Sequence, residues 1–141
     1  MQSNLMFEDR HDLDLLKFKK MYLAGKRKFC LIDLSEMSLS GENLKEIDLK
    51  GADLSGSYLD RTDLSNANLR YSNLFGADLS GADLRGTNFK NTNLVWTCLA
   101  LALYDERTQF PGDFSPQDHQ MIFQPHQKVN AIALTKRSQG K

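Results

Sequence analysis

An apolar residue recurs at every fifth position through the middle of this 141-residue chain. The fourteen positions are Leu34, Leu39, Leu44, Leu49, Leu54, Leu59, Leu64, Leu69, Leu74, Leu79, Leu84, Phe89, Leu94 and Leu99. Five steps of about 100° on an α-helix scatter such residues around the cylinder, and five steps along a flat strand alternate them between faces. Neither element buries them together. The spacing therefore predicts a backbone that bends sharply once per quintet, so that these side chains form one structural core in a narrow interior.

The neighbours of each apolar position support this prediction. The residue two places earlier points to the same side, and from Ala52 onward it is always Ala, Ser or Thr, as a narrow interior requires. The residue immediately before is mostly Asp or Asn, which bond nearby backbone groups and favour turns. Glu42 breaks the inward pattern. We expect it to turn outward or to meet a cap residue such as Arg27, because burying an unpaired carboxylate is too costly.

Four quintets carry a resemblance to a known family. The runs ADLSG (52–56), ANLRY (67–71), ADLSG (77–81) and ADLRG (82–86) resemble the pentapeptide-repeat proteins. The resemblance implies an all-β solenoid, a right-handed quadrilateral β-helix with four quintets per coil and therefore about three and a half coils. The flanking segments 15–34 and 104–117 resemble the entry and exit of small cyanobacterial members.

A stack of coils needs a cover at each end, because both ends expose apolar surface and unpaired backbone groups. We therefore expect an N-terminal helical cap in residues 1–28, the repeat β-helix in residues 29–103, and a C-terminal cap segment and tail in residues 104–141. The N-terminal helix is expected over 12–24, with Asp12 as its N-cap. It would place its apolar residues over the first coil.

The exit segment contains a second helix signal. Ser115 offers an N-cap hydroxyl, Pro116 suits the first helical position, and Asp118 lies three residues after the cap. This pattern predicts a short C-terminal helix over residues 116–123.

Residues twenty apart stack on one face if four quintets make a coil. Lys50, Arg70 and Lys90 then form a basic ladder with a rung about every 5 Å, and Tyr71 lies beside it. The ladder is a possible binding surface for an anionic partner, because like charges at that spacing repel one another. The alternative is a solvated face on which the long side chains splay apart, with Asp48 nearby.

The same stacking gathers Phe75, Val95 and Trp96 at outward positions. An exposed apolar cluster of this size marks a contact. We expect it to be a cap contact covered by aromatic residues of the C-terminal segment, with a homodimer contact as the second reading and a partner-protein site as the third. The expected covering residues are Phe110, Phe114 and Phe123.

Composition limits the location and the chemistry of the chain. Eighteen basic and eighteen acidic residues cancel, so net charge gives no attraction to nucleic acid or to an anionic membrane. No run approaches the ~20 apolar residues that span a bilayer, and the first residues lack a secretory pattern. We expect a soluble, cytoplasmic protein. Cys30 and Cys98 are expected to lie roughly 15 Å apart, too far for a disulfide.

No catalytic constellation is present in the sequence. His11, His119 and His126 lie in the flanks, apart from any nucleophile motif or phosphate-binding loop. We expect no enzyme activity, no cofactor, no metal, no small-molecule substrate and no direct contact with nucleic acid or membrane. The expected function is a protein-interaction or scaffold module, a monomer or homodimer that presents coil faces to an unknown protein partner. The alternative is a DNA-mimicking modulator of a DNA-binding protein such as gyrase, an activity of longer, acidic family members.

Overall fold

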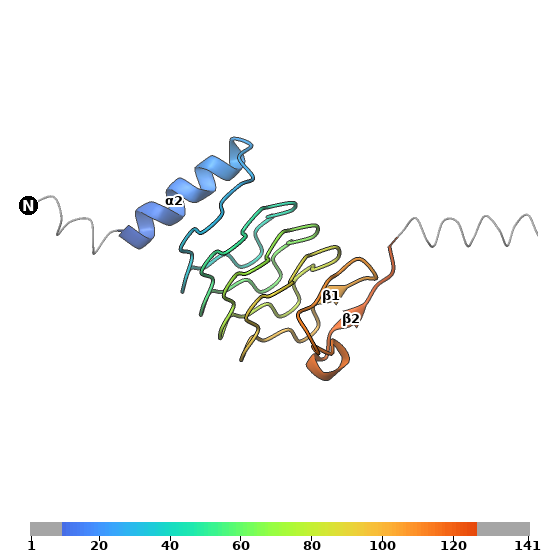
Figure 1. The fold of residues 1–141 in the computed structure, drawn as a ribbon. Coiled ribbons are helices and arrows are strands. Elements are labelled where there is room, and N and C mark those ends of the chain that lie inside the picture. Colours follow the sequence, from blue (N-terminus) through green and yellow to red (C-terminus); the bar gives the residue numbers. More distant parts are fainter. Residues whose placement is uncertain (1–9, 127–141) are drawn as a thin grey trace, which may run out of the picture.

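The computed structural model describes residues 10–126, and it is a stack of coils between one helix and a short exit segment (Figure 1). Helix α2 spans Arg10–Leu23 and lies at one end of the stack. At the other end are the two-residue strands β1 (Leu103–Tyr104) and β2 (Ile122–Phe123), which pair in parallel. The 3-10 helix η1 (Gln117–His119) precedes β2.

The coils are held together by parallel bridges between residues twenty apart. The bridges run from Lys28 with Asp48 to Asp83 with Leu103, one for each quintet. On one side, for example, Leu54 N donates to Asn73 O at 2.8 Å. A twenty-residue register is four quintets, so each coil has four sides and every side is a narrow parallel sheet.

The interior is one continuous apolar column. Thirteen of the fourteen repeat residues are at most 3% exposed, and Leu94 is half-buried. Buried hydroxyls beside the column are bonded to carbonyl groups. Thr62 Oγ1 donates to Leu39 O at 2.8 Å, and Ser57 Oγ donates to Leu54 O at 2.6 Å. The small polar residues of the repeat therefore sit in the interior without an unsatisfied group.

Each corner is a four-residue turn fixed by the residue before the apolar position. At one corner Ala52 N donates to Leu49 O at 2.9 Å, while Asp48 Oδ1 accepts from Lys50 N at 3.1 Å. The third turn residue has positive φ, which favours glycine. Gly86 shows a second constraint, because a Cβ there would lie 2.2 Å from Asn66 Oδ1 of the coil below.

Helix α2 closes the N-terminal end mainly through Phe18. Phe18 is 2% exposed, and its ring meets that of Phe29 edge to face at 4.8 Å. The helix begins at Arg10 and ends at Leu23, so the expectation that Asp12 is an N-cap is wrong. Leu16 and Leu23 are exposed, so the apolar face of this helix is narrower than its sequence predicts.

Glu42 meets the N-terminal cap, although through a different residue from the one expected. Its carboxylate pairs with Lys19 Nζ of α2 at 2.8 Å, and both side chains remain partly exposed. Arg27 instead stacks over the ring of Tyr22, with its Cζ 4.0 Å from the ring centroid. Tyr22 Oη donates to Lys45 O at 3.0 Å, which ties the helix to the first coil.

The predicted helix over 116–123 is wrong. The structure has one 3-10 turn at Gln117–His119, followed by β2. Pro116 occupies the cap position without a side-chain cap bond, and Ser115 Oγ contacts Gln117 Oε1 at 3.2 Å instead. Pairing of β2 with β1 provides backbone bonds that a continued helix would have lost.

Two further findings concern expected properties of the chain. Cys30 and Cys98 are both free and exposed. Within residues 10–126, no helix has the length and apolarity needed to cross a membrane.

Candidate protein-interaction surface

The two residue groups singled out in the sequence lie at neighbouring corners of the β-helix. Between these corners runs one side of the stack, which we call the front face. The front face consists of residues 32–36, 52–56, 72–76 and 92–96. The corner before the front face carries the basic ladder, and the corner after it carries the aromatic cluster.

The basic ladder is Lys50, Arg70 and Lys90, with Tyr71 beside it. Lys50 Nζ lies 5.8 Å and Arg70 Cζ 5.6 Å from the centroid of the Tyr71 ring. Lys90 follows on the next rung, where its carbonyl accepts from Tyr71 N at 3.2 Å. Arg70 Nε is buried and has no hydrogen-bond partner among the described residues. The corner therefore offers positive charge and an exposed aromatic ring together.

The aromatic cluster is Phe75, Val95 and Trp96. The ring centroids of Phe75 and Trp96 are 5.1 Å apart. Val95 is the residue of the next coil that lies beside Phe75, twenty positions later in the sequence. Phe75 is 39% exposed, Val95 54% and Trp96 81%. Trp96 also has φ of 58°, a conformation that costs a non-glycine residue about 1 kcal/mol. An indole fixed outward at a strained corner is a candidate contact.

The expected cover of this cluster by C-terminal aromatic residues is wrong. Phe110 stacks on Phe89 at 5.9 Å and on Phe114 at 4.9 Å, while Phe123 packs against Tyr104 at 5.4 Å. Phe110 and Phe114 pack against the C-terminal end of the apolar interior, whereas Phe123 remains exposed beside Tyr104. The exit aromatic residues therefore lie at the end of the column and not over the Phe75 cluster.

The distance between the two corners suits one binding surface. Tyr71 and Phe75 are turn residues at the two ends of this side, four residues apart, so at most roughly 13 Å of backbone separates them. Asn73 lies between them, and its amide oxygen accepts from Asn93 Nδ2 at 3.1 Å. A partner that covers the front face would contact the positive corner and the apolar corner at once.

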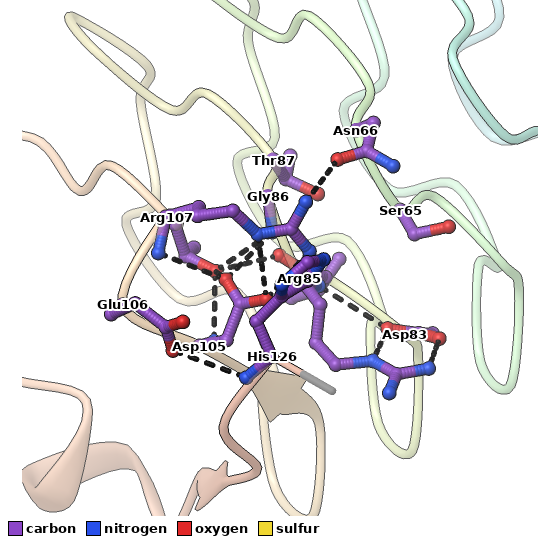
Figure 2. Close-up of polar contacts among 12 residues, drawn as sticks. Ser65, Asn66, Asp83, Arg85, Gly86, Thr87, Asp105, Glu106, Arg107 and His126 are labelled. Atoms are coloured by element: carbon purple, nitrogen blue, oxygen red, sulfur yellow. Dashed lines mark hydrogen bonds and ion pairs between the residues drawn. The ribbon is translucent and has the colours of Figure 1, made fainter. Parts of the chain in front are cut away.

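A polar network at the exit corner was missed by the sequence reasoning (Figure 2). Asp105 is 2% exposed, and its Oδ1 accepts from Gly86 N and from Arg107 N, each at 3.0 Å. In the coil below, Asn66 N bonds a backbone carbonyl, that of Arg85, at 2.9 Å. The carboxylate of Asp105 thus replaces the carbonyl that a further coil would supply.

The signal for this network is a one-residue insertion. Repeat positions are twenty apart up to the bridge of Asp83 with Leu103, whereas Asn88 pairs with Gln109, twenty-one residues later. Thr108 Oγ1 still donates to Leu84 O at 2.9 Å, as the inward threonines of earlier coils do. A break in the five-residue spacing after Leu103, with Asp105 in it, could have indicated a special corner.

Hydrogen bonds, chiefly from arginine residues, lower the pKa of both carboxyl groups at this corner. Burial alone would raise the pKa of Asp105, but hydrogen bonds from Arg107 and Gly86 outweigh it and hold the pKa below its ordinary value. The pKa of Asp83 is lowered in the same way. Burial raises it, but the hydrogen bonds from Arg85, whose Nη2 lies 2.6 Å from Asp83 Oδ2, outweigh the effect of burial. Carboxylates that stay ionised and bonded to arginine are suited to structure rather than proton transfer.

The histidines and acids form no assembled metal site within residues 10–126. No group of three or more His, Cys, Asp or Glu side chains in that range is placed to hold a metal ion. His119 stacks on Phe114 at 4.2 Å, and its Nδ1 lies 2.9 Å from Ser115 O. Its role is therefore to pack the exit segment.

Comparison with known proteins agrees with this geometry. The family model of pentapeptide repeats matches residues 32–66 and 67–102. A crystal structure of a pentapeptide repeat protein from Nostoc Pcc 7120 is 33% identical, with a TM-score of 0.55, and the match covers 77% of this chain and 94% of that one. No curated protein matches the sequence.

A second solved structure is a pentapeptide repeat protein from the thylakoid lumen of Arabidopsis thaliana. It is 30% identical with a TM-score of 0.55, and the match covers 65% of this chain and 60% of that one. These neighbours imply a right-handed quadrilateral β-helix, and proteins of this kind are generally structural or interaction proteins rather than enzymes. The five-residue spacing, the four-sided register and these matches together establish that the chain belongs to the pentapeptide-repeat family.

Proposed function

We propose that this chain is a non-enzymatic protein-interaction module that binds a protein partner through its front face. The observation that carries the proposal is Trp96, an indole 81% exposed and fixed against Phe75 at a strained corner. Exposed aromatic residues on a rigid scaffold lose little conformational entropy on binding, and they dominate interface energetics. The scaffold of about three and a half coils keeps the corner residues in fixed positions.

The basic ladder forms the second part of the proposed surface. Lys50 Nζ and Arg70 Cζ lie 5.8 Å and 5.6 Å from the centroid of the Tyr71 ring, so a partner carboxylate near this ring would be attracted by both cations. Charge of this kind guides association and orientation more than it adds affinity. A DNA-mimicking function is less well supported, because a mimic needs an acidic face and this corner is basic.

The experiment compares capture of proteins from a lysate of the source organism by four forms of the chain. They are the wild type, the double variant Phe75→Ala/Trp96→Gly, the triple variant Lys50→Ala/Arg70→Ala/Lys90→Ala, and Leu101→Gly. Leu101 is the matched control, because it is an exposed apolar corner residue with φ of 62° on a corner that does not border the front face.

We expect a partner to be retained by Leu101→Gly, lost from the aromatic double variant and reduced in the ladder variant. A partner retained by the wild type and all three variants alike would contradict the proposal. Light scattering on the purified chain separates a homodimer from a partner site, since a dimer that dissociates in Phe75→Ala/Trp96→Gly would assign the cluster to self-association.

A further inference from the structure

The exit segment forms backbone hydrogen bonds along two sides of the last coil and at one end of a third. Phe89 N donates to Gln109 O at 2.7 Å on the first side, and β2 pairs with β1 on the second. On the third side, residues 97–101, Leu101 N donates to Gln120 O at 2.9 Å, whereas Leu99 N and Thr97 O have no backbone partner among the described residues. The fourth side is the front face. Its last rung, residues 92–96, receives no further rung from the exit segment.

In the earlier coils of the front face, two N–H groups and one carbonyl of each rung are used by the next rung. Leu74 N donates to Asn93 O at 2.9 Å, and Gly76 N donates to Val95 O at 3.0 Å. In return Asn93 N donates to Ser72 O at 3.0 Å. One extended segment therefore satisfies three backbone groups of the rung beneath it.

The equivalent groups of the last rung are unpaired among the described residues. Leu94 N and Trp96 N donate to none of them, and Thr92 O accepts from none. Leu94 is also half-buried, whereas its equivalents in the earlier coils are fully buried. The rung thus lacks both the backbone partner and the side chain that a following rung would supply.

The chain's own exit segment does not fill this place. Residues 111–116 follow the last paired segment, but no backbone hydrogen bond joins them to residues 92–96. Pro111 has no N–H to donate, and Phe114 N bonds back to Pro111 O at 3.0 Å in a local turn. Phe114 instead stacks on Phe110 over the end of the interior.

The first coil also has unpaired backbone groups, but they differ in their surroundings. Ser38 N and Asn43 N have no backbone acceptor among the described residues. Their rungs present Ser40 and Lys45 at the corners, side chains that leave the edge well hydrated. The rung at 92–96 instead presents Val95 and Trp96, so water there is bordered by apolar surface.

We propose that the front-face rung at residues 92–96 is completed by an extended segment of a partner protein, which adds as the next parallel rung. The inference rests on the proposed function and names the chemistry of its partner. Main-chain hydrogen bonds to Leu94, Trp96 and Thr92 give affinity, as in other cases of β-strand addition. Side chains at the two corners give specificity.

The register of the earlier coils defines the residues that fit. Asn88 pairs with Gln109, so in the same register the chain's own Pro111 falls opposite Lys90, and the partner segment begins opposite Thr92. Its residue opposite Leu94 should be aliphatic, since it would complete the burial of Leu94. The next residue lies opposite Val95 and should be apolar, in contact with Trp96.

The test uses the peptide acetyl-ANLVG-amide, whose five residues would lie opposite residues 92–96. Its matched control is the same peptide with an N-methyl group on the asparagine, which removes the N–H directed at Thr92 O. Binding is followed by amide NMR of the full chain. We expect the amide signals of Leu94 and Trp96 to move to lower field and their exchange with solvent to slow.

We expect N-methylation to weaken binding about ten-fold, the effect of one hydrogen bond. Trp96→Gly should also weaken it about ten-fold, whereas Leu31→Gly should leave it unchanged. Glycine suits the positive φ at both corners, so both variants should fold. Amide spectra of the unbound variants check this.

Three results would overturn strand addition: no binding at millimolar peptide, equal binding of the N-methylated peptide, or signal changes confined to other residues. If the chain is a dimer in which the Leu94 and Trp96 amides are already protected from exchange, a second copy of the chain covers this rung. That result would also overturn the proposed partner segment. Capture of a partner that depends on Phe75 and Trp96, without peptide binding, would leave the proposed function standing and remove only this inference.

Discussion

The two ends of the β-helix cover the apolar interior in different ways. At the N-terminal end, α2 covers the interior with one buried ring, Phe18, and lies over a first coil whose corners are mainly polar. At the C-terminal end, stacked rings such as Phe110 and Phe114 cover the interior, while the front rung stays apolar and exposed. Covering an apolar interior and pairing a backbone edge are therefore separate tasks.

The difference between the two ends supports the choice of the front rung as the proposed binding edge. Unpaired backbone groups occur at both ends, and water can satisfy those bordered by polar side chains. At the C-terminal front rung they coincide with the exposed side chains of Val95 and Trp96 and with the half-buried Leu94, so hydration there is unfavourable. These features together are the reason for proposing this rung as a binding edge.

The largest expected effect is at the N-terminal cover. Phe18→Ala removes the ring that closes the column, and we expect it to lower the free energy of unfolding by about 3–5 kcal/mol, as for other buried aromatic residues. Leu16→Ala, an exposed position of the same helix, should change it by less than about 0.5 kcal/mol. Urea unfolding measures both. Equal effects would show that α2 does not close the stack.

The next largest effect is at the exit corner. Asp105→Ala leaves Gly86 N and the Arg107 guanidinium without their carboxylate, and we expect a loss of about 2–3 kcal/mol in unfolding free energy. The control is Asp113→Ala, an exposed acid of the same segment. If both variants unfold at the same urea concentration, the carboxylate does not take the place of a further coil.

The same carboxylate predicts a pH dependence. Because the pKa of Asp105 is lower in the folded chain than its ordinary value of 3.8, its contribution to stability is present above about pH 4 and is lost as pH falls through the folded pKa. Asp105→Asn should therefore lose less stability than the wild type when the pH is lowered from about 5 to about 3, a range that extends about one pH unit to either side of the ordinary pKa. Thermal unfolding at each pH measures the difference, and parallel curves would refute the assignment.

The smallest effect is the ion pair between α2 and the first coil. Lys19 and Glu42 are 2.8 Å apart but partly exposed, so water screens their attraction. A double-mutant cycle with both residues changed to Ala should give a coupling of about 0.5 kcal/mol or less, reduced further by 0.5 M salt. A coupling comparable to the loss in Phe18→Ala would mean that charge, and not ring burial, holds the cap.

Much of the fold was predictable because the residue pattern of the repeat is compatible with one backbone conformation in every quintet. A residue every five positions, a small residue two places earlier and an Asx turn former between them specify the interior and the corners of each quintet. Adjacent quintets have the same pattern of residues, so the structure expected for one quintet is expected for every quintet of the stack. The basic ladder and the aromatic cluster were found by counting twenty residues along that stack.

The ends were not predictable in the same way. Ser115-Pro116 has the pattern of a helix start, yet pairing of β2 with β1 limits the helix to one 3-10 turn. Glu42 needed a cationic partner, but which cation depended on how α2 lies across the first coil, and the pairing is with Lys19. Outcomes of this kind depend on contacts between segments far apart in sequence.

The sequence by itself determined the bend once per quintet and the single aliphatic column, because periodicity and residue size act within a few residues. Tertiary structure decided where Phe110 and Phe114 went, how Asp105 replaced a missing carbonyl, and that Leu94 and Trp96 kept unpaired N–H groups among the described residues. The physical reason is that each quintet favours the same turn and the same inward residues as its neighbours, whereas the structure of the ends depends on contacts between segments far apart in sequence.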